Sequence, residues 1–185
     1  MILPITVYGD PILRKISEPI DQNYENLDQV IDNMWETMYH ADGVGLAAPQ
    51  IGLSIRIFVI DGSSMAEEEP ELENFKITFI NAEILERTGE VVPFNEGCLS
   101  LPQIREDVNR PSKVRIRYLD RNWVQHEEEY TGFAARVIQH EYDHLDGKLF
   151  IDHLSLIRRK LLKSKLTAIS LGKIKVSYRI KLPKK

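Results

Sequence analysis

The segment His140-Glu141-Tyr142-Asp143-His144 constrains this 185-residue sequence more than any other feature. The pattern from about residue 133 to 145 predicts a helix that ends at Gly147. Histidines four positions apart share one helix face, so both imidazoles can bind one metal ion, and Glu141 lies beside the place of a bound water. Segments this short also arise by chance, so a helix with two ordinary histidines is the alternative. A third ligand decides between these interpretations.

Residues downstream of this helix provide no clear third ligand. Some zinc peptidases take a histidine six residues after the second one, but this position is Phe150. Others take a downstream glutamate, and no glutamate follows Glu141. A zincin-type metallopeptidase is one enzyme class that the two histidines allow, and both absences argue against it. The downstream candidates that are left are Asp146, Asp152 and His153.

The strongest candidate for the third ligand lies upstream and is Cys98, the only cysteine of the chain. Gly97 before it and Pro102 after it predict a shaped loop or a strand end rather than a helix interior. An isolated cysteine is usually a small buried apolar residue. One cysteine and two histidines, however, make a site with an open position for water, as catalytic metal sites have. A single thiol forms no internal disulfide, which is typical of a reducing cytosol.

Residues 43–52, with the sequence Gly-Val-Gly-Leu-Ala-Ala-Pro-Gln-Ile-Gly, form a second unusual segment. It lacks the Gly-Lys-Ser/Thr ending of a phosphate loop and the GxGxxG spacing of a dinucleotide site. Small residues allow the backbone to run close to a substrate, and the Gln50 amide can donate to a developing oxyanion. The alternative is a tight connection between a helix and a strand, without a catalytic role.

Hydrophobic periodicity and turn residues predict an α+β fold, with the strands grouped apart from the helices. Helices are expected at residues 27–39, 133–145 and 154–170, with a short helix from Pro11. Strands are expected at residues 55–60, 76–80, 82–86, 91–94, 113–119 and 123–130, with a possible closing strand at 174–180. Gly43 is expected to end the first long helix in a left-handed conformation. One side of the C-terminal helix should carry Leu154, Ile157, Leu161 and Leu162.

Charge is distributed unevenly along the chain. Residues 153–185 hold 11 of the 24 Lys and Arg residues and no acidic residue, so all 28 Asp and Glu lie in the rest of the chain. A basic tail on an acidic body favours contact with an anionic partner, or it simply keeps a terminal helix soluble. The acidic run at 67–73 is expected to be an exposed, solvated loop. No apolar run is long enough to span a membrane, and no signal peptide is predicted.

In this order, the three motifs resemble those of the bacterial-type peptide deformylases. That family carries GxGxAAxQ, EGCxS and HExxDH segments, which match Gly43–Gln50, Glu96–Ser100 and His140–His144. The similarity covers nearly the whole chain, from Gly9-Asp10-Pro11 to Asp146-Gly147. The resemblance implies one α+β domain over residues 1–185, with antiparallel sheets packed around a central helix that carries HExxH.

The resemblance also implies a residue for each part of a metal-dependent deformylation. The implied metal ligands are Cys98, His140 and His144. Glu141 is implied as the general base and then the proton donor. The oxyanion would be bound by the Gln50 amide and the Leu99 N–H, while Gly45 offers its backbone to the substrate. The expected substrate-binding residues are Gly43, Val44, Arg105, Arg136 and Val137.

Two arginines need separate expectations. Arg136 stands where many family members have an apolar residue near the methionine pocket, and its charge is expected at the pocket rim while its stem packs apolarly. Arg110 is expected to pair with Asp143 and so to hold the helix against the loop that follows Cys98.

The implied substrate is the N-formylmethionyl end of nascent polypeptides, which is hydrolysed in the cytoplasm with release of formate. The implied working ion is Fe²⁺, in whose place Zn²⁺ or Ni²⁺ is often found. Some members of the family dock on the ribosome by their C-terminal segment, and the basic residues 153–185 would suit that contact. No membrane partner is expected.

Overall fold

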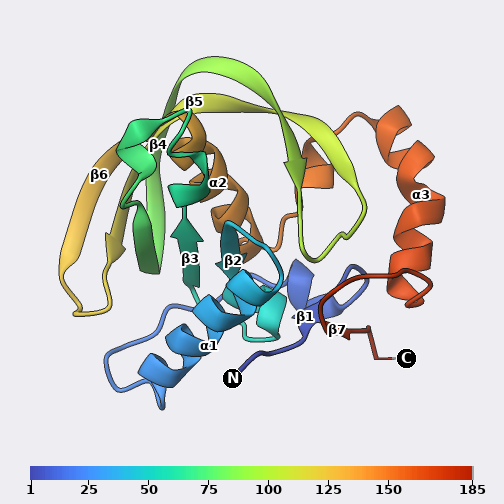
Figure 1. Cartoon of the computed structure of the whole chain (residues 1–185), viewed down its shortest axis with the longest axis horizontal. Helices are drawn as coiled ribbons and strands as arrows, with labels where there is room; N and C mark the ends of the chain where they lie inside the picture. Colours follow the sequence, from blue (N-terminus) through green and yellow to red (C-terminus); the bar gives the residue numbers. More distant parts are fainter. Residues whose placement is uncertain (185) are drawn as a thin grey trace.

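The helix that carries both histidines, α2 (Gly132–Leu145), packs against an antiparallel sheet in the computed structural model, which describes residues 1–184 (Figure 1). The sheet has the strand order β2-β3-β4-β5-β6. Its strands are β2 (Gly45–Ala47), β3 (Ile57–Asp61), β4 (Lys76–Gly97), β5 (Arg105–Leu119) and β6 (Gln125–Thr131). Helices and strands are segregated, so the α+β expectation is confirmed. No helix within residues 1–184 is both long and apolar enough to cross a membrane.

The three strands expected between residues 76 and 94 are one long strand, β4, with register shifts where breaks were expected. Its partner β5 begins at Arg105, well before the predicted start at residue 113. Residues alternate between buried and exposed from Arg105 onward, but the buried positions include Glu106 and Arg110. Because these inward side chains are charged, hydrophobic alternation does not reveal this half of the strand.

Helix α1 (Leu27–His40) matches its prediction and packs on the sheet through Ile31, Met34 and Met38. The left-handed residue after it is Asp42, with φ 54°, so the expectation of a left-handed Gly43 is wrong. Glycine is needed at position 43 for space, since a Cβ there would lie 2.9 Å from Leu99 Cδ1. This close approach brings the end of α1 next to the turn that holds Cys98.

The acidic loop at 62–75 contains two short 3-10 turns, η3 (Ser63–Met65) and η4 (Pro70–Leu72), and Leu72 is buried. The expectation of a purely solvated loop is therefore incomplete. Both carboxylate oxygens of Glu69 accept the N–H of Phe133, at 3.1 and 3.0 Å. A negative charge at the first turn of α2 stabilises the helix dipole, so the loop supports the helix that bears the histidines.

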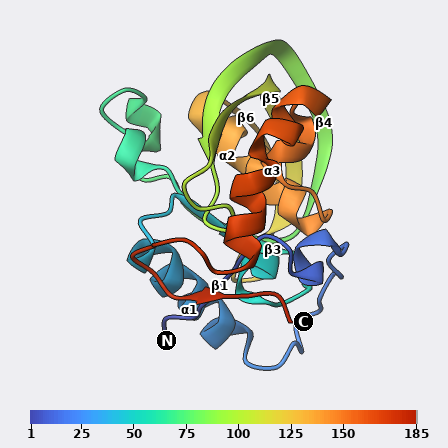
Figure 2. The ribbon, with the colours of Figure 1, turned by 90° about the vertical axis from the view of Figure 1, so that its right-hand side faces the viewer.

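Helix α3 (Leu156–Ser170) follows a 3-10 turn, η5 (Phe150–His153), and contacts the core through Leu162, Leu166 and Ile169. The predicted apolar side is wrong in part, because Ile157 and Leu161 are 72% and 67% exposed. Beyond α3 the chain folds back across the body (Figure 2). The closing strand expected at 174–180 is wrong except at its last residue: the strand β7 (Ile180–Lys181) begins there and pairs in parallel with β1 (Ile5–Thr6).

Candidate active site

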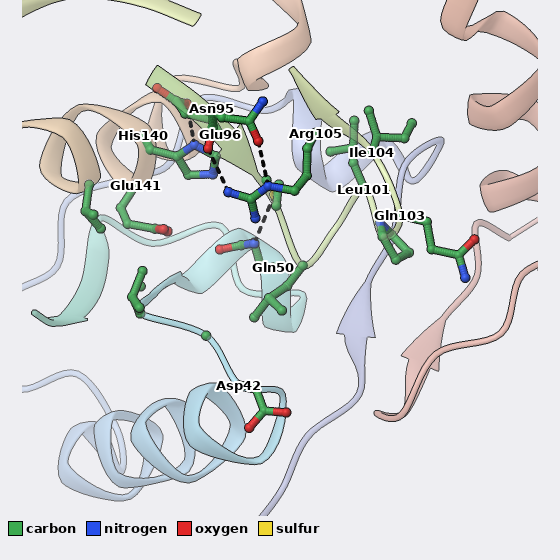
Figure 3. A pocket seen from close by; sticks show the side chains of 18 of the residues that line it. Asp42, Gln50, Asn95, Glu96, Leu101, Gln103, Ile104, Arg105, His140 and Glu141 are labelled. Carbon is green, nitrogen blue, oxygen red and sulfur yellow. Dashed lines mark hydrogen bonds and ion pairs between the residues drawn. The ribbon is translucent and has the colours of Figure 1, made fainter. Parts of the chain in front are cut away.

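A cleft of ≈ 680 Å³ lies beside α2, the end of β4 and the segment that leads into β2 (Figure 3). Every predicted site residue lines this cleft except His144, which is buried. Sequence reasoning missed the apolar lining residues Met65, Phe94 and Phe133. Phe133 lies one helical turn before Val137, so helix periodicity could have found it. The C-terminal lining residues Lys175–Tyr178 carry no local signal for such a role.

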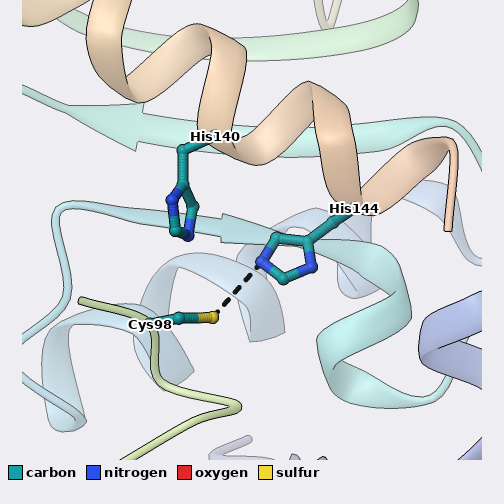
Figure 4. A group of neighbouring side chains, drawn as sticks. All are labelled: Cys98, His140 and His144. Carbon is teal, nitrogen blue, oxygen red and sulfur yellow. Dashed lines mark hydrogen bonds between the residues drawn. The ribbon is translucent and has the colours of Figure 1, made fainter. Parts of the chain in front are cut away.

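The predicted metal ligands converge at the floor of this region. The ligand atoms of Cys98, His140 and His144 all lie within 4.8 Å of one another, and Cys98 Sγ is 3.3 Å from His144 Nε2 (Figure 4). The two imidazoles project from neighbouring turns of α2, with ring centroids 5.3 Å apart. Cys98 follows β4 in a turn closed by the N–H of Leu101, which donates to the Cys98 carbonyl.

The donor set fits a divalent transition metal. Thiolate and imidazole are ligands that zinc, iron and nickel accept, and three protein ligands leave a position free for water or substrate. Burial lowers the pKa of His144 to about 3, so this imidazole is neutral, as a metal ligand must be. Burial acts in the same direction on His140, but contacts with Cys98 and Glu96 outweigh it and raise its pKa.

The other downstream candidates for the third ligand are engaged elsewhere. Asp146 pairs with Arg56 at 3.2 Å, and Asp152 pairs with Arg14. His153 Nε2 lies 2.7 Å from Asp143 Oδ2. None of these side chains joins the cluster of Cys98 and the two helix histidines within residues 1–184.

Glu96 is the centre of a buried ion network that reaches His140. Its Oε2 lies 2.9 Å from His140 Nδ1, and Arg110 donates to both of its oxygens at 2.7 and 3.0 Å. Burial opposes ionisation, but His140 and Arg110 hold the pKa of Glu96 well below its usual range. Such a carboxylate fixes the orientation of the imidazole and increases its basicity as a ligand.

Arg110 extends this network to the far side of α2. Its Nη1 donates to Asp143 Oδ2 at 2.7 Å, which confirms the expected Arg110–Asp143 pair. Burial again opposes the charge, yet His153 and Arg110 lower the pKa of Asp143 to about 2. Arg110 therefore links two buried carboxylates, Glu96 on β4 and Asp143 on α2.

Arg136 does not place its charge at the pocket rim, so that expectation is wrong. The residue is 6% exposed, and its guanidinium donates to Glu96 Oε1 at 3.0 Å. It also donates to the carbonyls of Val108 at 3.0 Å and Val92 at 2.7 Å. Since these carbonyls belong to β5 and β4, Arg136 fastens both strands to α2. Its charge is neutralised below the cleft surface.

Replacing Arg110 with alanine is expected to destabilise the protein by about 3–5 kcal/mol, because two buried carboxylates, Glu96 and Asp143, each lose an arginine partner. Metal affinity should fall about 10–100-fold, as it does when the support of a ligating histidine is lost. Chemical denaturation and metal competition titrations would measure both effects. As a control, Arg115→Ala removes an arginine whose ion pairs are exposed. Unchanged stability and metal affinity in Arg110→Ala would mean that the network is inert.

Gln50 and Leu99 flank the metal ligands. The Gln50 side chain is buried, and its oxygen accepts the N–H of Ala47 at 2.8 Å. This bond turns its Nε2 toward Cys98 Sγ at 3.6 Å and Ser100 Oγ at 3.3 Å. The Leu99 N–H makes no backbone hydrogen bond within residues 1–184. Two N–H donors therefore lie next to Cys98: the Leu99 N–H and the Gln50 amide.

Glu141 is buried against Gly45. A Cβ at position 45 would lie 2.5 Å from Glu141 Oε1, so glycine is required for the carboxylate to occupy this place. Glu141 Oε2 is buried and has no hydrogen-bond partner within residues 1–184. Burial raises the pKa of Glu141 to about 7. A carboxyl group with such a pKa can take up and release a proton near neutral pH.

Comparison with known proteins decides the family. The model of the family described as polypeptide deformylase matches residues 2–160 of the chain. The chain belongs to this family. Its resemblance to the peptide deformylases is thereby confirmed, and its class is that of a metal-dependent hydrolase, while the zincin-type alternative finds no support.

The polypeptide deformylase relatives cover the whole molecule. The chain is 52% identical to the peptide deformylase of Christiangramia forsetii, with 99% of this chain and 97% of the relative aligned. Among solved structures it is similar to a peptide deformylase from Legionella pneumophila, with a TM-score of 0.81, 40% identity and coverage of 94% of this chain and 98% of that one. The peptide deformylase from Thermotoga maritima gives a TM-score of 0.75 at 45% identity, with 84% and 99% covered.

Proposed function

We propose that this polypeptide deformylase removes the formyl group from N-terminal formylmethionine of nascent polypeptides and releases formate. The observation that carries the proposal is the buried Oε2 of Glu141, which has no hydrogen-bond partner within residues 1–184 and lies on the same helix as the two imidazoles that cluster with the Cys98 thiol. The cluster opens onto a cleft with an apolar section, which suits a methionine side chain. Cytoplasmic action by residues 1–185 as one domain is part of the same proposal.

The metal would be held by Cys98, His140 and His144, whose ligand atoms lie within 4.8 Å of one another. Bound there, a divalent ion supplies a water of pKa about 7 and polarises the formyl carbonyl. Glu96 keeps His140 in a ligating orientation through its contact with Nδ1.

Glu141 moves the proton in this reaction. As the water oxygen forms a bond to the formyl carbon, its proton passes to Glu141. When the C–N bond breaks, Glu141 returns a proton to the methionine nitrogen, which leaves as an amine beside formate. A group that takes and then gives a proton needs a pKa near the working pH, and burial places the pKa of Glu141 at about 7.

Gln50 and Leu99 stabilise the oxygen that gains negative charge. The Gln50 Nε2 and the Leu99 N–H are both adjacent to Cys98. Within residues 1–184 the Leu99 N–H has no backbone acceptor, and the acceptors of Gln50 Nε2 are Cys98 Sγ and, at 3.3 Å, Ser100 Oγ. Loss of one such donor typically costs about 10²–10³-fold in rate. The backbone of Gly45 lies against Glu141 and so faces the substrate's formyl end.

The methionine side chain would occupy the apolar part of the cleft, lined by Val44, Phe94, Phe133 and Val137. Gly43 keeps the backbone close to Leu99 on one side of this space. Arg136 contributes through its stem, since its guanidinium is buried in the network. Arg105 lies at the exposed mouth, held by Asn95 at 2.8 Å, where it would contact the substrate backbone.

The test of this function compares formylmethionyl with acetylmethionyl peptides of the same sequence. Gly45 lies close against Glu141, and Gly43 lies close against Leu99, so the space for the formyl group should admit a hydrogen and resist a methyl group. Forcing a methyl group into a packed site costs about 1–3 kcal/mol, so acetyl release should be about 10–100-fold slower. Formate and acetate release would be assayed separately. Comparable rates for both peptides would contradict the proposed pocket.

Iron is the proposed working ion. Two imidazoles and a thiolate bind zinc more tightly than ferrous iron by general affinity order. The ion that binds most tightly and the ion that gives the highest activity are therefore separate questions. Apoprotein reconstituted anaerobically with Fe²⁺, Ni²⁺ or Zn²⁺ should be most active with iron. Activity with iron should decline in air, and activity with nickel should persist. Full air-stable activity with zinc alone would contradict the proposal.

The ribosome is the proposed partner, and we propose α3 as the part of the basic C-terminal segment that contacts it. The end of the tail is paired with β1, whereas α3 exposes Arg159, Lys160 and Lys163 beside Leu156 and Ile157. Replacing the three basic residues by glutamate should weaken co-sedimentation with ribosomes. Unchanged co-sedimentation would exclude α3 as the contact.

A further inference from the structure

The C-terminal segment 175–178 forms one wall of the substrate cleft. Lys175, Val176, Ser177 and Tyr178 line the same cleft as Glu141 and Cys98, although they lie far from both in the sequence. In Figure 3 the Gln103 side chain extends away from the metal-binding region toward the returning C-terminal chain. The cleft therefore has an inner part built by the deformylase motifs and an outer part completed by the tail.

Hydrogen bonds fix segment 175–178 in this position at both of its ends. Tyr178 donates its hydroxyl to the Leu99 carbonyl at 2.8 Å, one residue from Cys98. Gln103 Nε2 donates to the Lys175 carbonyl at 2.7 Å. Beyond them, the N–H of Ile5 donates to the Arg179 carbonyl at 2.8 Å. Segment 175–178 is thus a built part of the cleft and not a free arm.

A polypeptide substrate must pass this wall. The proposed reaction holds the formyl end at Glu141 and the methionine side chain in the apolar pocket, so the following residues leave through the open side of the cleft. Among the described residues, the exposed charged residues that line the cleft are Asp42, Arg105 and Lys175. Arg105 is held against β4 by Asn95, whereas the Lys175 side chain is exposed on the tail.

We infer that segment 175–178 is an outer subsite for substrate residues that follow formylmethionine, and that Lys175 makes it favour acidic over basic residues there. The inference rests on the proposed deformylase function and adds to it a choice among substrates. Two cations against one carboxylate give the exposed part of the cleft lining a positive balance. An exposed ion pair changes a binding constant by only a few-fold, so the expected preference is about 2- to 5-fold.

The test compares three peptides: formyl-Met-Ala, formyl-Met-Ala-Ala-Glu and formyl-Met-Ala-Ala-Lys. In the wild type, kcat/KM for the glutamate peptide should exceed that for the lysine peptide by about 2- to 5-fold at low salt. Lys175→Glu should reverse this ratio, and salt near 1 M should bring it to about one in both proteins. The ratio is taken within one enzyme, so overall changes in activity cancel.

Lys173→Glu is the matched control. It makes the same charge change two residues away, at an exposed position that does not line the cleft. A ratio that Lys175→Glu leaves unchanged would overturn the inference. An equal shift in Lys173→Glu would overturn it too, because it would show a general effect of net charge. Absence of formate release from all three peptides would instead refute the proposed function, which keeps the two failures distinct.

Discussion

Replacing Glu141 with glutamine is expected to lower the rate of formate release by about 10²–10⁴-fold, the usual contribution of a general acid–base group. Glutamine keeps the size of the side chain but can neither take up nor return the proton. Glu96, the other buried carboxylate of the cleft, already accepts from Arg110, Arg136 and His140. It is therefore not free to take over the proton transfer.

The same variant should keep its metal and its stability. Glu141 Oε2 makes no hydrogen bond within residues 1–184, so an amide at this position breaks no contact of that oxygen. Formate release, metal content and thermal unfolding would be measured together. Glu90→Gln, at an exposed position on β4, serves as control and should match the wild type. If Glu141→Gln with a full metal complement keeps more than a tenth of the activity, the proposed proton carrier is wrong.

The parts of the site that the sequence predicts well are those whose geometry is local. Two histidines four positions apart on a helix face the same side whatever the rest of the chain does. Cys98 could be predicted because the alternatives downstream of His144 were few. Gln50 and Leu99 came with the family motifs, and the structure gives them a physical setting beside the same sulfur.

The parts that the sequence did not predict depend on partners that are distant in the chain. Arg136 was expected at the rim because a lone arginine normally keeps its charge in water. Glu96 allows the Arg136 charge to be buried away from water. Its Oε1 lies 3.0 Å from Arg136 Nη1 and 2.7 Å from Arg110 Nε. Buried charge also explains why the first half of β5 was not predicted. Glu106 and Arg110 occupy inward positions of this strand that usually carry apolar side chains.

The return of the tail was the least predictable feature. Strands β1 and β7 contribute two residues each, which is too short to leave a periodic pattern. Their pairing depends on the length of α3 and on the turn at Gly172, where φ is 68°. The basic character of residues 153–185 suggested a single role, contact with an anionic partner. In the fold, these residues form two different parts: the helix α3 and the segment 175–178 that lines the cleft.

Replacing Cys98 with alanine is expected to remove the metal and, with it, deformylase activity. Loss of a group that merely supports a ligating histidine costs about 10–100-fold in metal affinity. Cys98 supplies one of the three proposed ligand atoms, so its loss should lower metal affinity by at least about 100-fold. Metal content after dialysis and formate release would be measured on the same preparation. Ser100→Ala, a small change in the same turn, should keep the metal.

The wild type offers a test that needs no substitution. Cys98 is the only thiol in the chain, so a thiol-specific reagent reports on one atom. The metal-free protein should react with one equivalent, because Cys98 is only half-buried. Addition of Ni²⁺ or Zn²⁺ should slow the reaction strongly, because the thiolate becomes a ligand. Equal reactivity with and without metal, or a Cys98→Ala variant that keeps one tightly bound ion, would mean that the two histidines bind metal without the sulfur. The proposed hydrolytic site would then lack its third ligand.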